Sequence, residues 1–212
     1  MTRKERPKRG TGRKTISIIV DGDTEVWYFQ MLRETEKLGQ LTIRPELPSK
    51  KTLAHQFDMV CTSAKEYDQV IWLIDADTII KEIRESNETS KIQEIKGYLD
   101  KIRSINDTRK VDVLFNTPCL EFWFLLHEKY TGRFYPKCEP VEALLARSTI
   151  LPSYTKTERY FKNPRLNIYQ RLRPALETAI KNAVRLGSFN IDEYESAKAE
   201  TYKSFELLGV KI

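Results

Sequence analysis

Short apolar runs that end in polar residues alternate in this chain with segments of helical periodicity. Three runs, rich in β-branched and aromatic residues, predict buried strands: 16–20, 70–74 and 111–115. Apolar residues recur at helical spacing in three intervening segments: 25–37, 52–66 and 91–105. This alternation predicts an α/β fold with βαβ units and a mainly parallel sheet that helices cover on both faces.

Local signals set the expected ends of the elements. Thr24 is expected to cap the first helix and Gly39 to end it. The segment 41–47, which contains a proline, predicts a weaker strand, and 119–127 predicts a mostly buried helix.

The C-terminal part of the chain lacks strand signals and is predicted to be helical with polar loops. Pro174 is expected to kink or divide a long helical stretch from Leu166 to Leu186. We therefore expect three parts: a basic arm over 1–14, an α/β core over 15–135, and a helical C-terminal extension over 136–212 that packs on the core.

The net charge of +6 is concentrated at the start of the chain. The bases of this arm are Arg3, Lys4, Arg6, Lys8, Arg9, Arg13 and Lys14. Such an arm favours nucleic acid, because bound lysine and arginine release counterions from phosphates. Arg9, Arg13 and Lys14 are therefore candidate contacts. A solvated tail fits the same composition, and both interpretations stay open.

Cysteine and histidine usage disfavours a zinc site and a disulfide framework. Cys61, Cys119 and Cys138 make an odd count at no metal-ligand spacing, and the only histidines are His55 and His127. No apolar run approaches the length of a membrane span. The basic start lacks the apolar segment of a signal peptide. We therefore expect a cytoplasmic protein without a membrane partner.

Acidic residues follow two of the predicted strands. Asp21 and Asp23 come after the first strand, with Glu25 opening the next helix, and Asp75 and Asp77 follow a later strand. Ligands of open α/β sheets bind beyond the carboxyl ends of the strands. Residues two apart in an extended chain point the same way, so both later aspartates would face one ion. Clustered carboxylates suit Mg²⁺ or Mn²⁺. Alternatively, these aspartates only end strands and cap turns.

Three other site types that bind phosphate groups or nucleotides lack their signatures. A haloacid-dehalogenase phosphatase would need Thr or Val where Ile79 stands, and a nucleophile after the first strand. The chain has no Gly-x-x-x-x-Gly-Lys-Ser/Thr loop, which excludes an autonomous P-loop ATPase. No Gly-x-Gly-x-x-Gly follows the first strand, so a Rossmann dinucleotide site has no support.

Several segments resemble blocks of RloB-like proteins. Residues 20–29 (VDGDTEVWYF) resemble the family opening EG-x-T-E-x-x-Y-F after a strand, and 74–77 (IDAD) resemble its D-x-D. Residues 116–127 (NTPCLEFWFLLH) resemble the most specific block, S-N-P-C-F-E-L-W-L-L-L-H, with one residue inserted. Segments 154–156 and 179–183 resemble later blocks, so the likeness spans nearly the whole chain after the arm.

This resemblance implies a Toprim-like fold in which an acid after the first strand and a later D-x-D form a magnesium site. RloB-like proteins occur near restriction loci and in abortive-infection systems, often beside an ATPase gene, and nuclease activity is the usual inference. The chain departs from the family at Asp21, where the family normally has Glu. Asp is one methylene shorter, and a misplacement of about 1 Å can lower a rate on the order of a hundredfold.

The candidate metal ligands are Asp21, Asp75 and Asp77, and the candidate catalytic residues are Asp21, Glu25 and Glu121. Glu25 equally fits a first-turn acid that the helix dipole favours.

Glu121 and His127 are six residues apart and do not share a helix face, so His127 is interpreted as packed and hydrogen-bonded. Aromatic residues expected in the core are Phe122, Trp123, Phe124 and Tyr130.

A later basic stretch contains Lys156 and Arg159 as candidate nucleic-acid contacts, and it fits a solvated loop equally well.

Two functions remain in competition. The first is a magnesium-dependent nuclease, or nuclease subunit, of a phage-defence system. The second is a non-catalytic module that binds nucleic acid or docks on an ATPase partner. The substrate, whether DNA, tRNA or another RNA, stays open.

Overall fold

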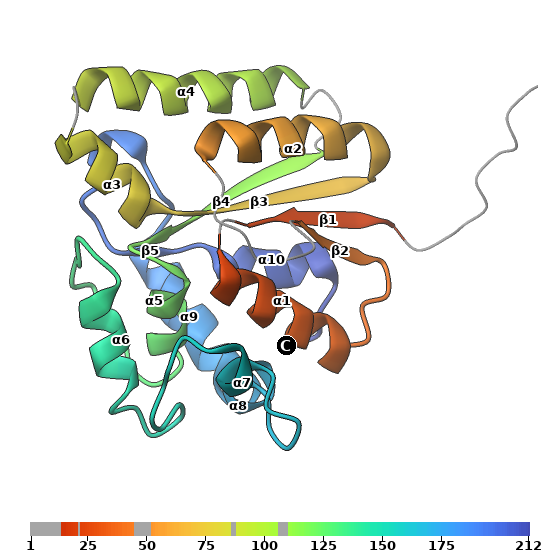
Figure 1. The fold of residues 1–212 in the computed structure, drawn as a ribbon, viewed down its shortest axis with the longest axis vertical. Helices are drawn as coiled ribbons and strands as arrows, with labels where there is room; N and C mark the ends of the chain where they lie inside the picture. The colour runs from red at the N-terminus through yellow and green to blue at the C-terminus, as the bar shows by residue number, and fades with distance from the viewer. Residues whose placement is uncertain (1–13, 21, 45–51, 86–87, 106–109) are drawn as a thin grey trace, which may run out of the picture.

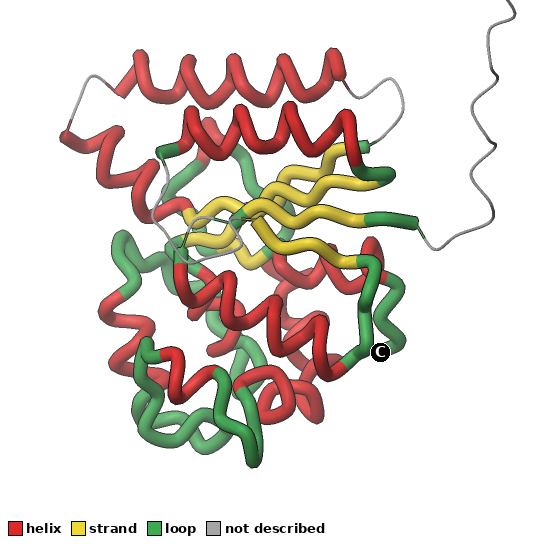
Figure 2. Tube along the Cα trace, turned by 45° about the vertical axis from the view of Figure 1, so that its right-hand side comes forward, coloured by secondary structure: helices red, strands yellow, loops and turns green. Residues whose placement is uncertain are grey.

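A five-stranded sheet lies at the centre of the molecule (Figure 2). The computed structural model describes residues 14–20, 22–44, 52–85, 88–105 and 110–212. In the order β2-β1-β3-β4-β5, the strands are β2 (Leu41–Arg44), β1 (Ile16–Ile19), β3 (Gln69–Asp75), β4 (Val111–Thr117) and β5 (Lys198–Ala199). The first four strands run parallel, and β5 pairs antiparallel with the end of β4. The predicted α/β fold with a mainly parallel sheet is confirmed.

Helices lie on both sides of this sheet (Figure 1). One face carries α2 (Leu53–Glu66), α3 (Ala76–Glu85) and α4 (Glu88–Ile105). On the other side lie α1 (Asp23–Thr35), α5 (Leu120–Leu125), α6 (Glu139–Leu145), α7 (Glu158–Phe161), α8 (Ile168–Leu172), α9 (Leu176–Leu186) and α10 (Thr201–Leu208). Short 3₁₀ helices span Arg173–Ala175 and Ile191–Glu193.

Strand alternation divides the core into two layers, as β3 shows. Ile71 and Leu73 belong to the cluster on the α1 and α5 side of the sheet. Val70, Trp72 and Ile74 belong to the cluster on the α2 and α4 side. All five side chains are buried. The continuous apolar run in the sequence is therefore a strand covered on both faces, as parallel sheets require.

The N-terminal end of α1 differs from the prediction. Gly22 is the N-cap residue, so the expected cap at Thr24 is wrong. The Thr24 hydroxyl instead donates to Glu25 Oε1 at 3.1 Å. The helix therefore begins before Thr24, which places Glu25 inside its first turn.

The C-terminal end of α1 also differs from the prediction. The helix ends at Thr35, so Gly39 does not end it. Lys37 takes a φ of 55°, and the Leu38 amide donates back to the Arg33 carbonyl at 2.9 Å. Because Leu38 is buried, its packing closes the helix without a glycine.

Two further elements depart from the sequence-based expectation. The chain enters α3 at once after β3, so Asp77 lies in a helical first turn and the expected strand alternation of Asp75 and Asp77 is wrong. The C-terminal part contributes β5 to the sheet although no strand was predicted there, because a two-residue strand is too short to leave a periodic signal. Of the strand predicted over 41–47, β2 covers the part up to Arg44. Residues 45–51 lie outside the described ranges.

The helical stretch around Pro174 is divided as predicted, with a 3₁₀ turn between α8 and α9. Phe122, Trp123 and Phe124 are buried in the core. Tyr130 is 41% exposed, so its expected core position is wrong. It lies beyond the end of α5, and the Arg185 guanidinium stacks 3.8 Å from its ring centroid.

Within the described ranges, none of the helices combines the length and the apolarity that crossing a membrane requires.

Candidate functional site

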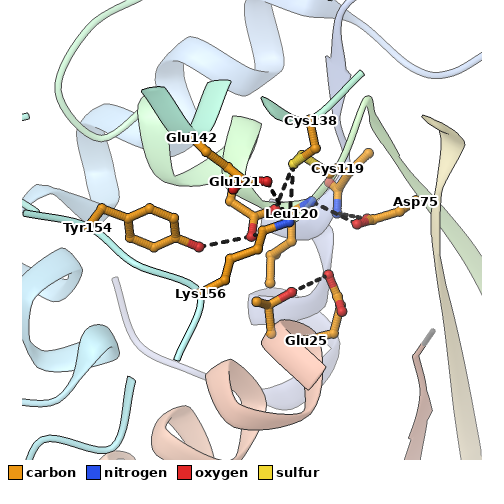
Figure 3. Close-up of a disulfide and its surroundings, with 11 residues drawn as sticks. Glu25, Asp75, Cys119, Leu120, Glu121, Cys138, Glu142, Tyr154 and Lys156 are labelled. Atoms are coloured by element: carbon orange, nitrogen blue, oxygen red, sulfur yellow. Dashed lines mark hydrogen bonds and ion pairs between the residues drawn. A yellow bond between two sulfur atoms is a disulfide. The ribbon is translucent and has the colours of Figure 1, made fainter. Parts of the chain in front are cut away.

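The carboxyl ends of β1, β3 and β4 meet at one edge of the sheet, where four of the predicted acidic residues gather. Asp75 ends β3, and Asp77 lies in the first turn of α3. Glu25 lies in the first turn of α1, and Glu121 in the first turn of α5, which follows β4. Figure 3 shows Glu25, Asp75 and Glu121 around the turn that contains Cys119.

Asp75 is oriented by groups from β4 and from the turn after it. The Leu120 amide donates to Oδ2 of Asp75 at 3.1 Å, and the Asn116 side-chain NH₂ donates to Oδ1 at 3.4 Å. Thr201 Oγ1, from α10, donates to Asn116 Oδ1 at 2.9 Å. Because the amide oxygen accepts this bond, the NH₂ group must face Asp75. Thr201, which is 85 positions from Asn116, thus orients Asp75 through Asn116, and no local sequence signal marks it.

Negative charge accumulates around Asp75. Its pKa is raised well above the usual value, first because neighbouring atoms displace water from the carboxyl. The charges that raise it further are the carboxylates of Glu25, Asp77 and Glu121, and a hydrogen bond with Glu25 adds to them. Carboxylates this close cannot all be ionised at low cost, so protons or cations are drawn to the group.

Glu25 occupies a space that a glycine leaves open. The side chain is 4% exposed. A Cβ atom at Gly22 would lie 2.8 Å from Oε2 of Glu25, so another residue there would displace the carboxylate. The glycine in this turn therefore admits the acid to the sheet edge.

Glu121 faces a cation and a hydroxyl (Figure 3). Its carboxylate is wholly buried. The Tyr154 hydroxyl donates to Oε1 at 2.8 Å, and Lys156 Nζ lies 3.2 Å from the same oxygen. Lys156 also pairs with Glu142 of α6 at 2.9 Å. Neither Tyr154 nor Glu142 was predicted for the site. Tyr154 lies in the segment 154–156, which resembles a family block but was given no chemical role for this residue, and Glu142 lies in a segment without a motif.

Burial determines the direction of the pKa shift in one partner of this ion pair, and neighbouring charge determines it in the other. Burial raises the pKa of Glu121, and Lys156 and Tyr154 lower it only in part. Burial also disfavours the charged Lys156 ammonium, but Glu121 and Glu142 outweigh it, so the pKa of Lys156 is raised. The lysine therefore stays protonated and supplies the charge that balances the buried carboxylate.

Cys119 and Cys138 form a disulfide, so the expectation against disulfides is wrong. The two residues are 19 positions apart. They meet because α5 packs against α6, whose N-cap residue is Cys138. Over the described ranges, the three side chains whose ligand atoms lie within 4.8 Å of one another are Cys119, Glu121 and Cys138. Among the described residues, Glu25, Asp75 and Asp77 do not form such a group.

Of the remaining predicted site residues, the structure describes Lys14 and Arg159, and neither lies at this edge. Asp21, Arg9 and Arg13 lie outside the described residues. Lys14 is exposed and precedes β1, so it lies at the opposite, amino edge of the sheet. Arg159 is exposed in the short helix α7.

His127 is packed and hydrogen-bonded, as interpreted from the sequence. Its side chain is buried, and Nδ1 lies 3.0 Å from the Trp123 carbonyl oxygen, to which it can donate as the Nδ1–H tautomer. Burial lowers its pKa to about 4, so the ring is neutral at physiological pH.

A family model described as RloB-like protein matches residues 16–205. The chain belongs to the RloB-like family. The match of this RloB-like chain begins at β1 and ends within α10, so it includes both groups of acids and the segment with Thr201. No curated protein and no solved structure matches the chain.

Proposed function

We propose that this RloB-like chain is a magnesium-dependent nuclease, or nuclease subunit, of a bacterial phage-defence system of the abortive-infection type, acting in the cytoplasm. The observation that carries the proposal is the gathering of Glu25, Asp75 and Asp77 at the carboxyl edge of a parallel sheet. A Toprim-like magnesium site has its acids in such a place, as the family resemblance implies.

The donor set fits a hard divalent cation. All its ligands are carboxylate oxygens, which Mg²⁺ and Mn²⁺ prefer. The pKa of Asp75 is raised first by burial and then by the charges of neighbouring carboxylates, and a cation would neutralise those charges. Binding would draw the carboxylates closer together than they lie here, because without a cation they repel one another. The predicted ligand Asp21 lies outside the described residues.

The cation would supply Lewis acidity toward a scissile phosphate and toward a water molecule. The chain's own residues would orient the metal ligands and balance their charge. Asn116 and Leu120 hold Asp75 in one orientation. Glu25, with a nearly buried carboxyl beside Asp75, is placed to hold a proton. Lys156, whose side chain is 37% exposed, is the proposed contact for a phosphate at this edge.

The proposed substrate is nucleic acid, with DNA, tRNA and other RNA as the alternatives. Arg9, Arg13, Lys14 and Arg159 are the proposed contacts outside the acidic edge. An ATPase subunit from a neighbouring gene is the proposed protein partner. Deletion of residues 1–14 should weaken nucleic-acid binding and flatten its salt dependence, because fewer counterions are released.

One sequence observation favours a second function. Asp21 replaces the family's usual Glu, and a shorter acid fits a weakened site that binds nucleic acid or an ATPase partner without cleaving. Comparing cleavage in magnesium with cleavage in EDTA, each with and without the partner, separates the two functions.

The metal site is tested by thermal unfolding. Mg²⁺ or Mn²⁺ should raise the Tm of the wild type, and the double variant Asp75→Asn with Asp77→Asn should lose this shift because two ligands lose their charge. The matched control is Asp58→Asn with Asp100→Asn, two exposed acids on α2 and α4, which should keep it. An equal shift in the site variant and the control would end the proposal of a metal centre.

Asp21 decides between the two functions. For a working site, Asp21→Asn should abolish cleavage without unfolding the chain, and Asp21→Glu should keep or raise the rate. If the wild type never cleaves and Asp21→Glu gains activity, the native chain is the binding subunit.

A further inference from the structure

The disulfide between Cys119 and Cys138 lies beside Asp75, Leu120 and Glu121 of the candidate site (Figure 3). Pro118 precedes Cys119, and its carbonyl oxygen accepts a hydrogen bond from the Asp77 amide at 2.9 Å. Leu120 follows Cys119, and its amide donates to Asp75 at 3.1 Å. The turn that carries one sulfur therefore positions both aspartates.

The second sulfur lies beside two charged groups. Cys138 Sγ is 3.1 Å from Glu121 Oε2 and 3.5 Å from Lys156 Nζ. A disulfide sulfur has no proton, so the contact with Glu121 is not a hydrogen bond while the disulfide is intact. A Cys138 thiol at the same place would donate to Glu121, and a Cys138 thiolate would face the Lys156 ammonium. The reduced sulfur thus has partners already in position.

We propose that Cys119 and Cys138 form a reversible redox site that exchanges with dithiols. A thiolate of the dithiol attacks Cys119 Sγ, the S–S bond breaks, and its electron pair leaves on Cys138 Sγ beside Lys156. The second thiolate of the reagent then attacks the reagent sulfur that is bonded to Cys119 in the mixed disulfide, and Cys119 leaves as a thiolate. Two electrons and two protons pass to the protein, and the reagent becomes a cyclic disulfide.

This exchange has a structural consequence at the candidate site. Cys119 and Cys138 are nearly inaccessible, at 2% and 5% exposure, so a dithiol reaches the Cys119 sulfur only when this region opens locally. Non-bonded sulfur atoms need more separation than bonded ones, and a close-packed interior yields only if the backbone moves. The movement falls on the turn that holds Asp75 and Asp77, or on the start of α6. The thiol–disulfide exchange is independent of the proposed function. Only its effect on a metal centre rests on the proposed function.

A metal bound by the reduced pair is the competing outcome. Cys119, Glu121 and Cys138 place ligand atoms within 4.8 Å of one another. The Lys156 ammonium at 3.5 Å from Cys138 Sγ opposes a cation there and favours thiol–disulfide exchange. Retention of Zn²⁺ by the reduced protein through dialysis would overturn the exchange proposal in favour of a metal site.

Thiol counting tests the exchange without any metal. The protein is equilibrated in mixtures of reduced and oxidised dithiothreitol, alkylated, and weighed intact. Because Cys61 is free, one alkylated thiol is expected in the oxidised protein and three in the reduced protein. Three thiols under fully oxidising conditions, or one under fully reducing conditions in the folded protein, would overturn the proposal.

Lys156→Gln tests the role of the ammonium. It should raise the ratio of reduced to oxidised dithiol at the midpoint by about threefold or more, because the leaving and reduced sulfur loses its cation. Glu142→Gln also breaks the Lys156 ion pair but leaves the ammonium beside the sulfur. It should therefore lower stability without raising the midpoint. An unchanged midpoint in Lys156→Gln, or an equal rise in Glu142→Gln, refutes the assignment.

Amide hydrogen exchange tests the link to the site. Reduction should speed exchange at the amides of Asp77 and Leu120 by about tenfold, because the turn loses its anchor. Amides in the middle of β3, away from the turn, should exchange at an unchanged rate. Equal protection of the turn in both redox states would show that the disulfide does not hold the site.

Discussion

Glu121 and Asp75 lie at the same edge of the sheet, but the fold stabilises them in different ways. Glu121 meets the Lys156 ammonium at 3.2 Å and the Tyr154 hydroxyl at 2.8 Å, so its charge is balanced within the chain. Asp75 accepts hydrogen bonds from the Leu120 amide and the Asn116 side chain, and the strongest charges around it are carboxylates. Burial alone therefore does not mark a metal ligand, because the neighbouring charge decides what a buried acid can bind.

The largest expected effect comes from removing the internal cation. Lys156→Met should lower the free energy of unfolding by about 2 kcal/mol, because Glu121 is left as a buried carboxylate without its countercharge. The value is below that of a fully buried pair because the Lys156 side chain is 37% exposed. Urea denaturation measures it.

The control is Lys162→Met, which removes a surface pair with Glu158 one helical turn away. It should cost no more than about 0.5 kcal/mol. Equal losses in the two variants would remove the distinction between the two acids.

The opposite sign is expected at Asp75. A pKa raised in the folded state means that stability present at low pH is lost as the pH rises through the folded value. Asp75→Asn should therefore stabilise the metal-free protein by about 1 kcal/mol near neutral pH. Melting in EDTA between about pH 5 and about pH 8 checks this.

The wild type should lose stability over this range more steeply than the variant. Parallel pH profiles, with a variant less stable at every pH, would show that the charge of Asp75 is already balanced.

The smallest effect is expected from the residues that orient Asp75. Thr201→Val should cost somewhat under about 1 kcal/mol, because the Asn116 oxygen loses its donor. The freed amide can then rotate, so the magnesium concentration for a half-maximal Tm shift should rise severalfold.

Thr201→Ser keeps the hydroxyl and should restore the wild-type magnesium dependence. A stability loss in Thr201→Val with unchanged magnesium dependence would assign Thr201 to packing alone.

Local periodicity explains how much of the fold was predictable. The run 70–74 predicted β3 and its acidic end, and the segment 52–66 predicted α2. Failures came where a tertiary contact outweighs the local signal. The packing of Leu38 closes α1 before Gly39, and α3 begins at Ala76, so Asp77 is helical.

The sequence by itself determined the alternation of the four parallel strands with helices and the placement of acids after strands, because both depend on neighbours a few residues apart. Only the tertiary structure decided what each acid meets. The partners come from far along the chain: Tyr154 is 33 residues from Glu121, and Thr201 is 85 residues from Asn116. The disulfide joins residues 19 apart whose spacing fits no motif. Local patterns carry no information about such contacts, since packing of whole elements creates them.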